Sequence, residues 1–105
     1  MKLGEVKTFP HVEADKAQAL KPLEEAAEVY AAWQVWDKWD ANAEFCELTE
    51  RQKADMVERA RRDALHEIAD CVTACCNLAA AMGCEDLRPY LQMAEHRNEE
   101  RGRYE

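Results

Sequence analysis

Residues 50–82, ERQKADMVERARRDALHEIADCVTACCNLAAAM, decide the fold of this chain. Their apolar side chains recur mostly at intervals of three or four residues, which is the spacing of one face of an α-helix. These residues are Met56, Val57, Ala60, Ala64, Ile68, Cys71, Cys75, Leu78 and Met82. Thr49 and Gln52 have the form of a capping box, and Gly83 is suited to end a helix in a left-handed conformation. We therefore predict one long helix over residues 50–82.

A second helical pattern precedes this stretch. Its apolar positions are Leu23, Ala26, Ala27, Tyr30 and Trp33, with Val29 and Trp36 beside them. We predict a helix over residues 16–39 with Asp15 as its N-cap, followed by a connection over residues 40–48. Pro22 either starts the main helix near its first turn or kinks a longer helix, and both alternatives stay open.

A third helix is predicted over residues 86–101, where Pro89 is tolerated in the first turn. Residues 1–15 are expected to form an irregular arm and residues 102–105 an irregular tail of a single domain spanning 1–105. The expected fold class is all-α, with an antiparallel helical hairpin plus a C-terminal helix. Because a hairpin needs packing partners, we expect a core of the four-helix-bundle type that is completed by oligomerisation.

Composition favours the same fold class and restricts the function. The chain has 105 residues, with only three glycines and three prolines. Its net charge of −8 makes a nucleic-acid polymer a poor partner, because phosphate contacts need clustered lysine and arginine. We expect no membrane partner, since no run of 18 apolar residues and no secretory signal is visible. The odd number of cysteines, five, fits reduced thiols and a cytoplasmic location.

Acidic residues form two pairs at helical spacing. Glu25 and Glu28 are three residues apart within EEAAE, and Glu67 and Asp70 are three apart within EIAD. Side chains at this spacing are neighbours on a helix, and Glu25 and Glu67 border the apolar faces of their helices. If the two helices pack antiparallel, the four carboxylates converge at one seam. Because converging carboxylates repel one another, we expect a hard divalent cation to hold them, Mg²⁺ with Mn²⁺ as a substitute.

The two acidic motifs resemble the EExxE…ExxD signature of the MazG-like family of all-α nucleoside triphosphate pyrophosphohydrolases. The stretch EIADCVTACCNLAAAMG and the ending RNEERGRY are similar in particular to the short phage and prophage members, so the resemblance covers residues 20–104. It implies Mg²⁺-dependent hydrolysis of a (deoxy)nucleoside triphosphate to the monophosphate and pyrophosphate, by a homodimer or homotetramer. The spacing from Glu28 to Glu67 is longer than in compact family members.

The resemblance also implies roles for the acidic residues. The metal ligands would be Glu25, Glu28, Glu67 and Asp70. Glu24 matches the first acid of the signature, and Glu24 and Glu67 are the candidate catalytic residues. The general base stays open among Glu24, Asp63 and a second metal ion.

Six further residues are candidates for contacts with the substrate: Asn77, Arg97, Asn98, Arg101, Arg103 and Trp33. The arginines suit bidentate recognition of phosphate, or they complement the negative C-terminal end of the last helix. Asn77 either contacts the substrate or is a half-buried polar residue bonded to backbone. Trp33 either stacks on a base or belongs to the core or to a dimer interface.

Three other interpretations compete with this one. A zinc site with Cys71, Cys75 and His66 is disfavoured, because no CxxC pair completes a tetrahedral ligand set, and buried free thiols are expected instead. A di-iron site would need a Glu-x-x-His motif on two helices, and the fragment Asp63…His66 is not that motif. The alternative function is a non-catalytic helical module that binds a nucleotide or a protein, although such a scaffold has no reason to keep repelling carboxylates.

Overall fold

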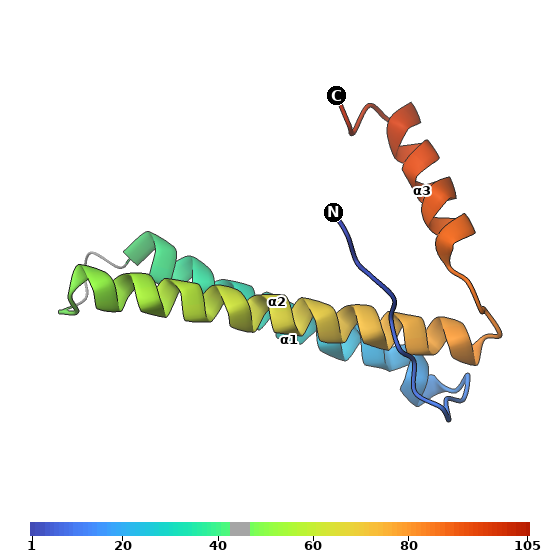
Figure 1. The fold of residues 1–105 in the computed structure, drawn as a ribbon. Helices are drawn as coiled ribbons and strands as arrows, with labels where there is room; N and C mark the ends of the chain where they lie inside the picture. Colours follow the sequence, from blue (N-terminus) through green and yellow to red (C-terminus); the bar gives the residue numbers. More distant parts are fainter. Residues whose placement is uncertain (43–46) are drawn as a thin grey trace.

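The computed structural model describes residues 1–42 and 47–105, and over these ranges its regular structure is all helical. The helices are α1 (Lys16–Asn42), α2 (Glu50–Ala81) and α3 (Arg88–Glu100). Figure 1 shows that α1 and α2 form a long antiparallel hairpin, whereas α3 projects away from it. The predicted all-α class and the hairpin with a third helix are confirmed. No helix in the described ranges is long and apolar enough to cross a membrane.

α1 begins at the predicted residue and ends three residues later than predicted. Asp15 caps its start, because the Asp15 carboxylate accepts a hydrogen bond from the backbone N–H of Gln18 at 2.8 Å. The helix continues through Pro22, so the longer of the two alternative helices is observed. The predicted connection over residues 40–48 falls partly outside the described residues.

α2 begins and ends with the predicted signals. The Thr49 hydroxyl accepts a hydrogen bond from the Gln52 N–H at 3.1 Å, and the Gln52 side chain accepts one from the Thr49 N–H at 2.9 Å. Gly83 has a φ of 86°, which only glycine adopts easily. The N–H groups of Gly83 and Cys84 then reach the carbonyls of Ala80 and Ala79 at 2.9 and 3.0 Å. This is a Schellman motif, which satisfies the last carbonyls of the helix.

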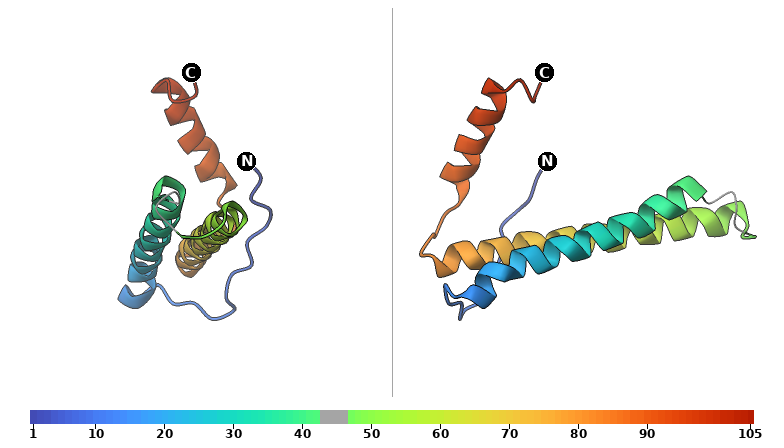
Figure 2. Two further views of the ribbon diagram at one scale, coloured as in Figure 1. Left: turned by 90° about the vertical axis from the view of Figure 1, so that its left-hand side faces the viewer. Right: turned by 180° about the vertical axis from the view of Figure 1, so that it is seen from behind.

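α3 is shorter than the predicted helix over residues 86–101. Asp86 lies before its first turn and accepts hydrogen bonds from the Arg88 backbone N–H at 3.0 Å and from the Arg88 guanidinium. These contacts lower the pKa of Asp86 to about 2. Over the described residues, no hydrogen bond or ion pair joins α3 to the hairpin, and its Tyr90 and Leu91 are exposed. Figure 2 shows the same separation from two further sides.

The seam between α1 and α2 uses a different face of α1 from the predicted one. The less exposed residues of α1 recur at alternating intervals of four and three: Gln18, Pro22, Glu25, Val29, Ala32, Trp36 and Trp39. The predicted Leu23, Tyr30 and Trp33 are instead 68%, 59% and 45% exposed. The prediction of this face was wrong because α1 is apolar on two faces, and spacing alone does not say which one meets α2.

The matching row of α2 has the same alternating spacing: Lys53, Val57, Ala60, Ala64, Glu67, Cys71, Ala74, Leu78 and Ala81. Intervals of four and three are those of coiled-coil packing. The predicted stripe placed Ile68, Cys75 and Met82 on this face, but all three are exposed in the structure. Among the described residues only Ala60, Ala74 and Asn77 are buried, so the seam is thin.

The capping box of α2 yields the first prediction. Replacement of Thr49 by alanine removes the acceptor for the Gln52 N–H and should lower the free energy of unfolding by about 1 kcal/mol. Urea denaturation followed by circular dichroism at one protein concentration measures this loss. Thr73→Ala is the matched control, because the Thr73 hydroxyl bonds the Ala69 carbonyl at 3.0 Å inside the helix and caps nothing. An equal loss of stability in both variants would contradict a capping role for Thr49.

Candidate metal centre

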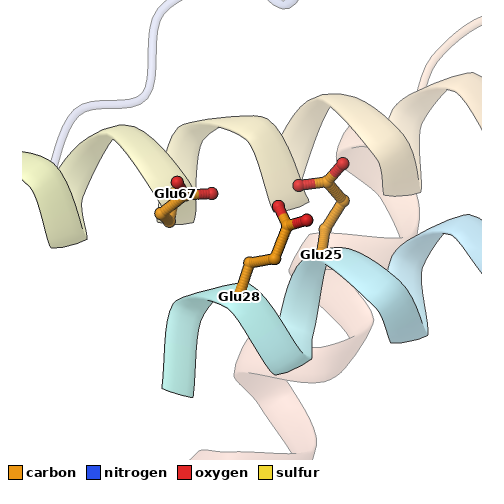
Figure 3. A group of neighbouring side chains, drawn as sticks. All are labelled: Glu25, Glu28 and Glu67. Carbon is orange, nitrogen blue, oxygen red and sulfur yellow. The ribbon is translucent and has the colours of Figure 1, made fainter. Parts of the chain in front are cut away.

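Three carboxylates meet at the seam of the hairpin. Glu25 and Glu28 extend from α1 and Glu67 from α2, and Figure 3 shows the three side chains gathered between the two helices. Each contributes one carboxylate oxygen to a group whose members all lie within 4.8 Å of one another. We call Glu25, Glu28 and Glu67 the acidic triad. Its three oxygens are close enough to bind one ion together.

The acidic triad exists because two acids occupy seam positions. Glu25 and Glu67 stand in the alternating rows that otherwise hold residues such as Val29 and Ala64. Residues in such rows face the partner helix and lose contact with water. Glu28 lies three residues after Glu25, so it reaches the same point from the margin of the seam.

Burial makes this arrangement electrostatically unfavourable without a positive partner. The side chain of Glu25 is only 13% exposed. The Oε2 atoms of both Glu25 and Glu67 are buried and have no hydrogen-bond partner. Burial, followed by the neighbouring Glu28, raises the pKa of Glu25, and the Lys21 ammonium 3.5 Å away opposes the rise. Buried oxygens without partners are uncommon in folded proteins, so these two are candidate ligand atoms.

The donor set of the acidic triad suits a hard cation. All three donors are carboxylate oxygens, which Mg²⁺ and Mn²⁺ prefer. The nearby thiol of Cys71 is a poorer ligand, because burial raises its pKa and its Sγ donates to the Pro22 carbonyl at 3.9 Å. Cys71, Cys75, Cys76 and Cys84 are free thiols, but the prediction that they are buried was wrong, because Cys75 is exposed and the other three are half-buried. The fifth cysteine, Cys46, lies outside the described residues.

Two of the predicted acids stand apart from the acidic triad. Asp70 is exposed on the next turn of α2 and does not join the group. Glu24 is exposed as well, and its carboxylate pairs with the Lys21 ammonium at 3.5 Å. Neither residue belongs to the two alternating rows of less exposed residues that form the seam, so each side chain leaves its helix beside the seam and not within it.

Asn77 holds the N-terminal arm. Its side-chain oxygen accepts a hydrogen bond from the backbone N–H of Phe9 at 2.9 Å, and the residue is only 2% exposed. Sequence analysis left open whether Asn77 contacts the substrate or bonds to backbone, and the structure shows a bond to backbone. Sequence analysis missed this contact because residues 1–15 carry no periodic pattern that could reveal where they pack.

The remaining candidates lie away from the acidic triad. Trp33 stacks on Tyr30, with ring centroids 5.9 Å apart, and is about 140° around α1 from Glu28. Arg97 and Asn98 lie in the last turn of α3, and Arg101 and Arg103 follow its end, where the Arg103 guanidinium donates to the Asn98 side chain at 3.1 Å. Because α3 projects from the hairpin, one chain does not bring these residues to the acidic triad (Figure 1).

Comparison of the chain with protein-family models, with curated proteins and with solved structures finds no match. Over the described residues the fold is all helical, and the seam of its hairpin holds a candidate carboxylate metal centre.

The contact between the arm and Asn77 yields a second prediction. Replacement of Asn77 by alanine removes the acceptor for the Phe9 N–H, so hydrogen exchange in residues 1–15 should accelerate by up to about tenfold. Hydrogen–deuterium exchange with mass spectrometry measures this rate. Thr73→Ala is the matched control, because the Thr73 hydroxyl bonds the Ala69 carbonyl within α2, and it should leave exchange in residues 1–15 unchanged. Unchanged exchange in Asn77→Ala would show that this bond does not hold the arm.

Proposed function

We propose that the protein is a nucleoside triphosphate pyrophosphohydrolase, which uses Mg²⁺ to cleave a (deoxy)nucleoside triphosphate into the monophosphate and pyrophosphate. The observation that carries this proposal is the acidic triad at the seam, with two buried carboxylate oxygens that lack partners. The resemblance of EEAAE and EIAD to the MazG-like signature supports the same function, because the triad residues are three of its acids.

Different residues of the chain would bind the metal ion and accept the proton of the attacking water. Bound Mg²⁺ supplies charge neutralisation and orientation of the phosphates. Glu25, Glu28 and Glu67 would hold the ion, and Asp70 would add a fourth carboxylate if its side chain turned toward the seam. Glu24 is an exposed carboxylate beside this group and would accept a proton from the attacking water, with Asp63 as the alternative base.

The pyrophosphate leaving group is negatively charged, so basic side chains would be needed to bind it. Arg97, Arg101 and Arg103 suit this task, because a guanidinium can bind phosphate through two parallel hydrogen bonds. Their contact with a nucleotide at the acidic triad requires either a movement of α3 or an α3 from another copy in a homodimer or homotetramer. The net charge of −8 favours a free nucleotide over a nucleic-acid polymer as the ligand, and we place the reaction in the cytoplasm.

A second candidate function is that of a non-catalytic helical module that binds a nucleotide or a protein. The observation that favours it is the separation of the arginines of α3 from the acidic triad within one chain. Binding of a nucleotide without turnover, measured by calorimetry, would support this second candidate.

Metal binding is the third prediction. Mg²⁺ or Mn²⁺ should raise the midpoint of thermal unfolding, because a ligand at 100 times its Kd adds about 2.7 kcal/mol of stability. Glu67→Gln removes one charge and one ligand. It should therefore be more stable than the wild type in chelator and should lose most of the response to metal, as measured by scanning calorimetry.

Glu58→Gln is the matched control for this experiment. It removes an exposed acid of the same helix, whose carboxylate pairs with Arg61 at 3.1 Å, away from the acidic triad. The control should keep the full metal response. Equal responses in the two variants would argue against the acidic triad as the metal site.

The reaction itself is the fourth prediction. Pyrophosphate release from a panel of canonical and modified nucleoside triphosphates should require Mg²⁺ and fall at least ~100-fold in Glu67→Gln, since the lost charge stabilisation is worth several kcal/mol. Release of single phosphate would refute the assignment of the cleaved bond. Metal-dependent stabilisation with no turnover on any substrate would favour the non-catalytic module.

A further inference from the structure

Two thiols of α2 stand one helical turn apart at the edge of the seam. Cys71 belongs to the seam row and is half-buried, whereas Cys75, four residues later, is exposed. Side chains at this spacing lie one above the other on a helix. Burial and then the neighbouring Cys75 raise the pKa of Cys71, so the two thiols lie close together.

Among the cysteines of residues 1–42 and 47–105, this pair has the spacing that a disulfide needs. Four residues of α-helix separate two Cα atoms by about 6 Å, within the range of about 4.4–6.8 Å seen in disulfides. Cys75 and Cys76 are adjacent, with Cα atoms only about 3.8 Å apart. Cys71 and Cys76 are five residues apart, which is about 7.5 Å along the helix. Cys84 lies beyond the end of α2.

A disulfide between Cys71 and Cys75 would distort α2 locally. On a regular helix the Cβ atoms of such a pair are about 5–6 Å apart, whereas a disulfide holds them about 3.8 Å apart. The backbone between the two residues must therefore move when the bond forms. Strained disulfides are easily reduced again, which is typical of regulatory and not of structural disulfides.

Cys71 also joins the two helices of the hairpin beside the acidic triad. Its thiol donates to the carbonyl oxygen of Pro22 in α1, with 3.9 Å between sulfur and oxygen. Cys71 follows Glu67 by four residues and Pro22 precedes Glu25 by three, so this contact lies about one turn from the acidic triad on each helix. A disulfide sulfur has no proton to donate. Oxidation of Cys71 would therefore remove this contact between the helices.

We propose that Cys71 and Cys75 form a thiol–disulfide switch, which a peroxide oxidises and which then loosens the seam next to the acidic triad. Reversible disulfides that sense an oxidant occur even in a reducing cytoplasm. The inference goes beyond the proposed function, because the disulfide depends on neither metal nor nucleotide. Only the effect of oxidation on metal binding rests on the acidic triad as the metal site.

The oxidation proceeds in two balanced steps. The sulfur of the exposed Cys75 attacks an oxygen of hydrogen peroxide and breaks the O–O bond, which gives a sulfenic acid at Cys75 and one water molecule. The sulfur of Cys71 then attacks the sulfur of Cys75 and forms the S–S bond. The displaced hydroxyl leaves with the Cys71 proton as a second water molecule. The two thiols thus lose two electrons and two protons, and the peroxide is reduced to two molecules of water.

Mass spectrometry after treatment with hydrogen peroxide tests the bond. The wild-type peptide that carries Cys71 and Cys75 should lose two hydrogen atoms, and a dithiol reductant should restore them. Cys75→Ser should not show this loss. Cys76→Ser is the matched control at the neighbouring position and should show it as the wild type does. No loss in the wild type, or a loss that persists in Cys75→Ser, would overturn the proposal.

Hydrogen exchange tests the effect on the seam without any metal. Exchange of the amides of residues 71–79 should be several-fold faster in the oxidised wild type than in the reduced wild type, because the helix is distorted there. Cys75→Ser should exchange equally before and after peroxide, which controls for oxidation of other side chains. Equal exchange in the oxidised and reduced wild type would overturn the switch.

Thermal unfolding with Mg²⁺ tests the link to the acidic triad. Oxidation should remove most of the rise in the unfolding midpoint that Mg²⁺ causes in the reduced wild type, and reduction should restore it. An unchanged rise after oxidation would overturn the link between the switch and the metal centre. Faster exchange after oxidation, with no response to Mg²⁺ even in the reduced protein, would support the switch and refute the metal centre of the proposed function.

Discussion

The candidate metal centre depends on two carboxylates placed where a helical hairpin normally buries apolar side chains. Glu25 and Glu67 occupy seam rows whose other members include Val29 and Ala64, and each has a buried oxygen without a partner. Such a conflict between local chemistry and packing lowers stability, and proteins keep it mostly at functional sites. Lys21 compensates only part of the charge, since the pKa of Glu25 is still raised.

The sequence predicts helix boundaries well because the signals that set them are local. Asp15, the Thr49–Gln52 capping box and Gly83 act within a few residues of the bonds that they make. α1 has two apolar rows, and packing against α2 determines which of them is buried. The composition of α1 alone does not predict this. The same limit applies to the hydrogen bond between Phe9 and Asn77, which joins residues 68 positions apart.

The candidate site was predictable in part for the same reason. Glu25 and Glu28 are adjacent on one helix, and Glu67 joins them through the antiparallel pairing that the helix order suggests. Whether Asp70 reaches the acidic triad depends on the direction of its side chain. Whether the arginines near the end of α3 reach it depends on the angle at which the chain leaves α2 after Gly83. The spacing of residues in the sequence predicts neither. Glu28, the exposed member of the acidic triad, lies on the side of the hairpin that also carries the exposed residues Glu24 and Asp70.

The small size of the buried residues has a further consequence for the metal centre. Ala60 and Ala74 each lie seven residues, or about two helical turns, from Glu67 on either side. Side-chain volume at such positions sets how closely two helices approach. These alanines therefore act as spacers that define the gap across which carboxylates from α1 and α2 share one ion. The affinity and size preference of the centre for cations would thus be determined by methyl groups that never touch the ion.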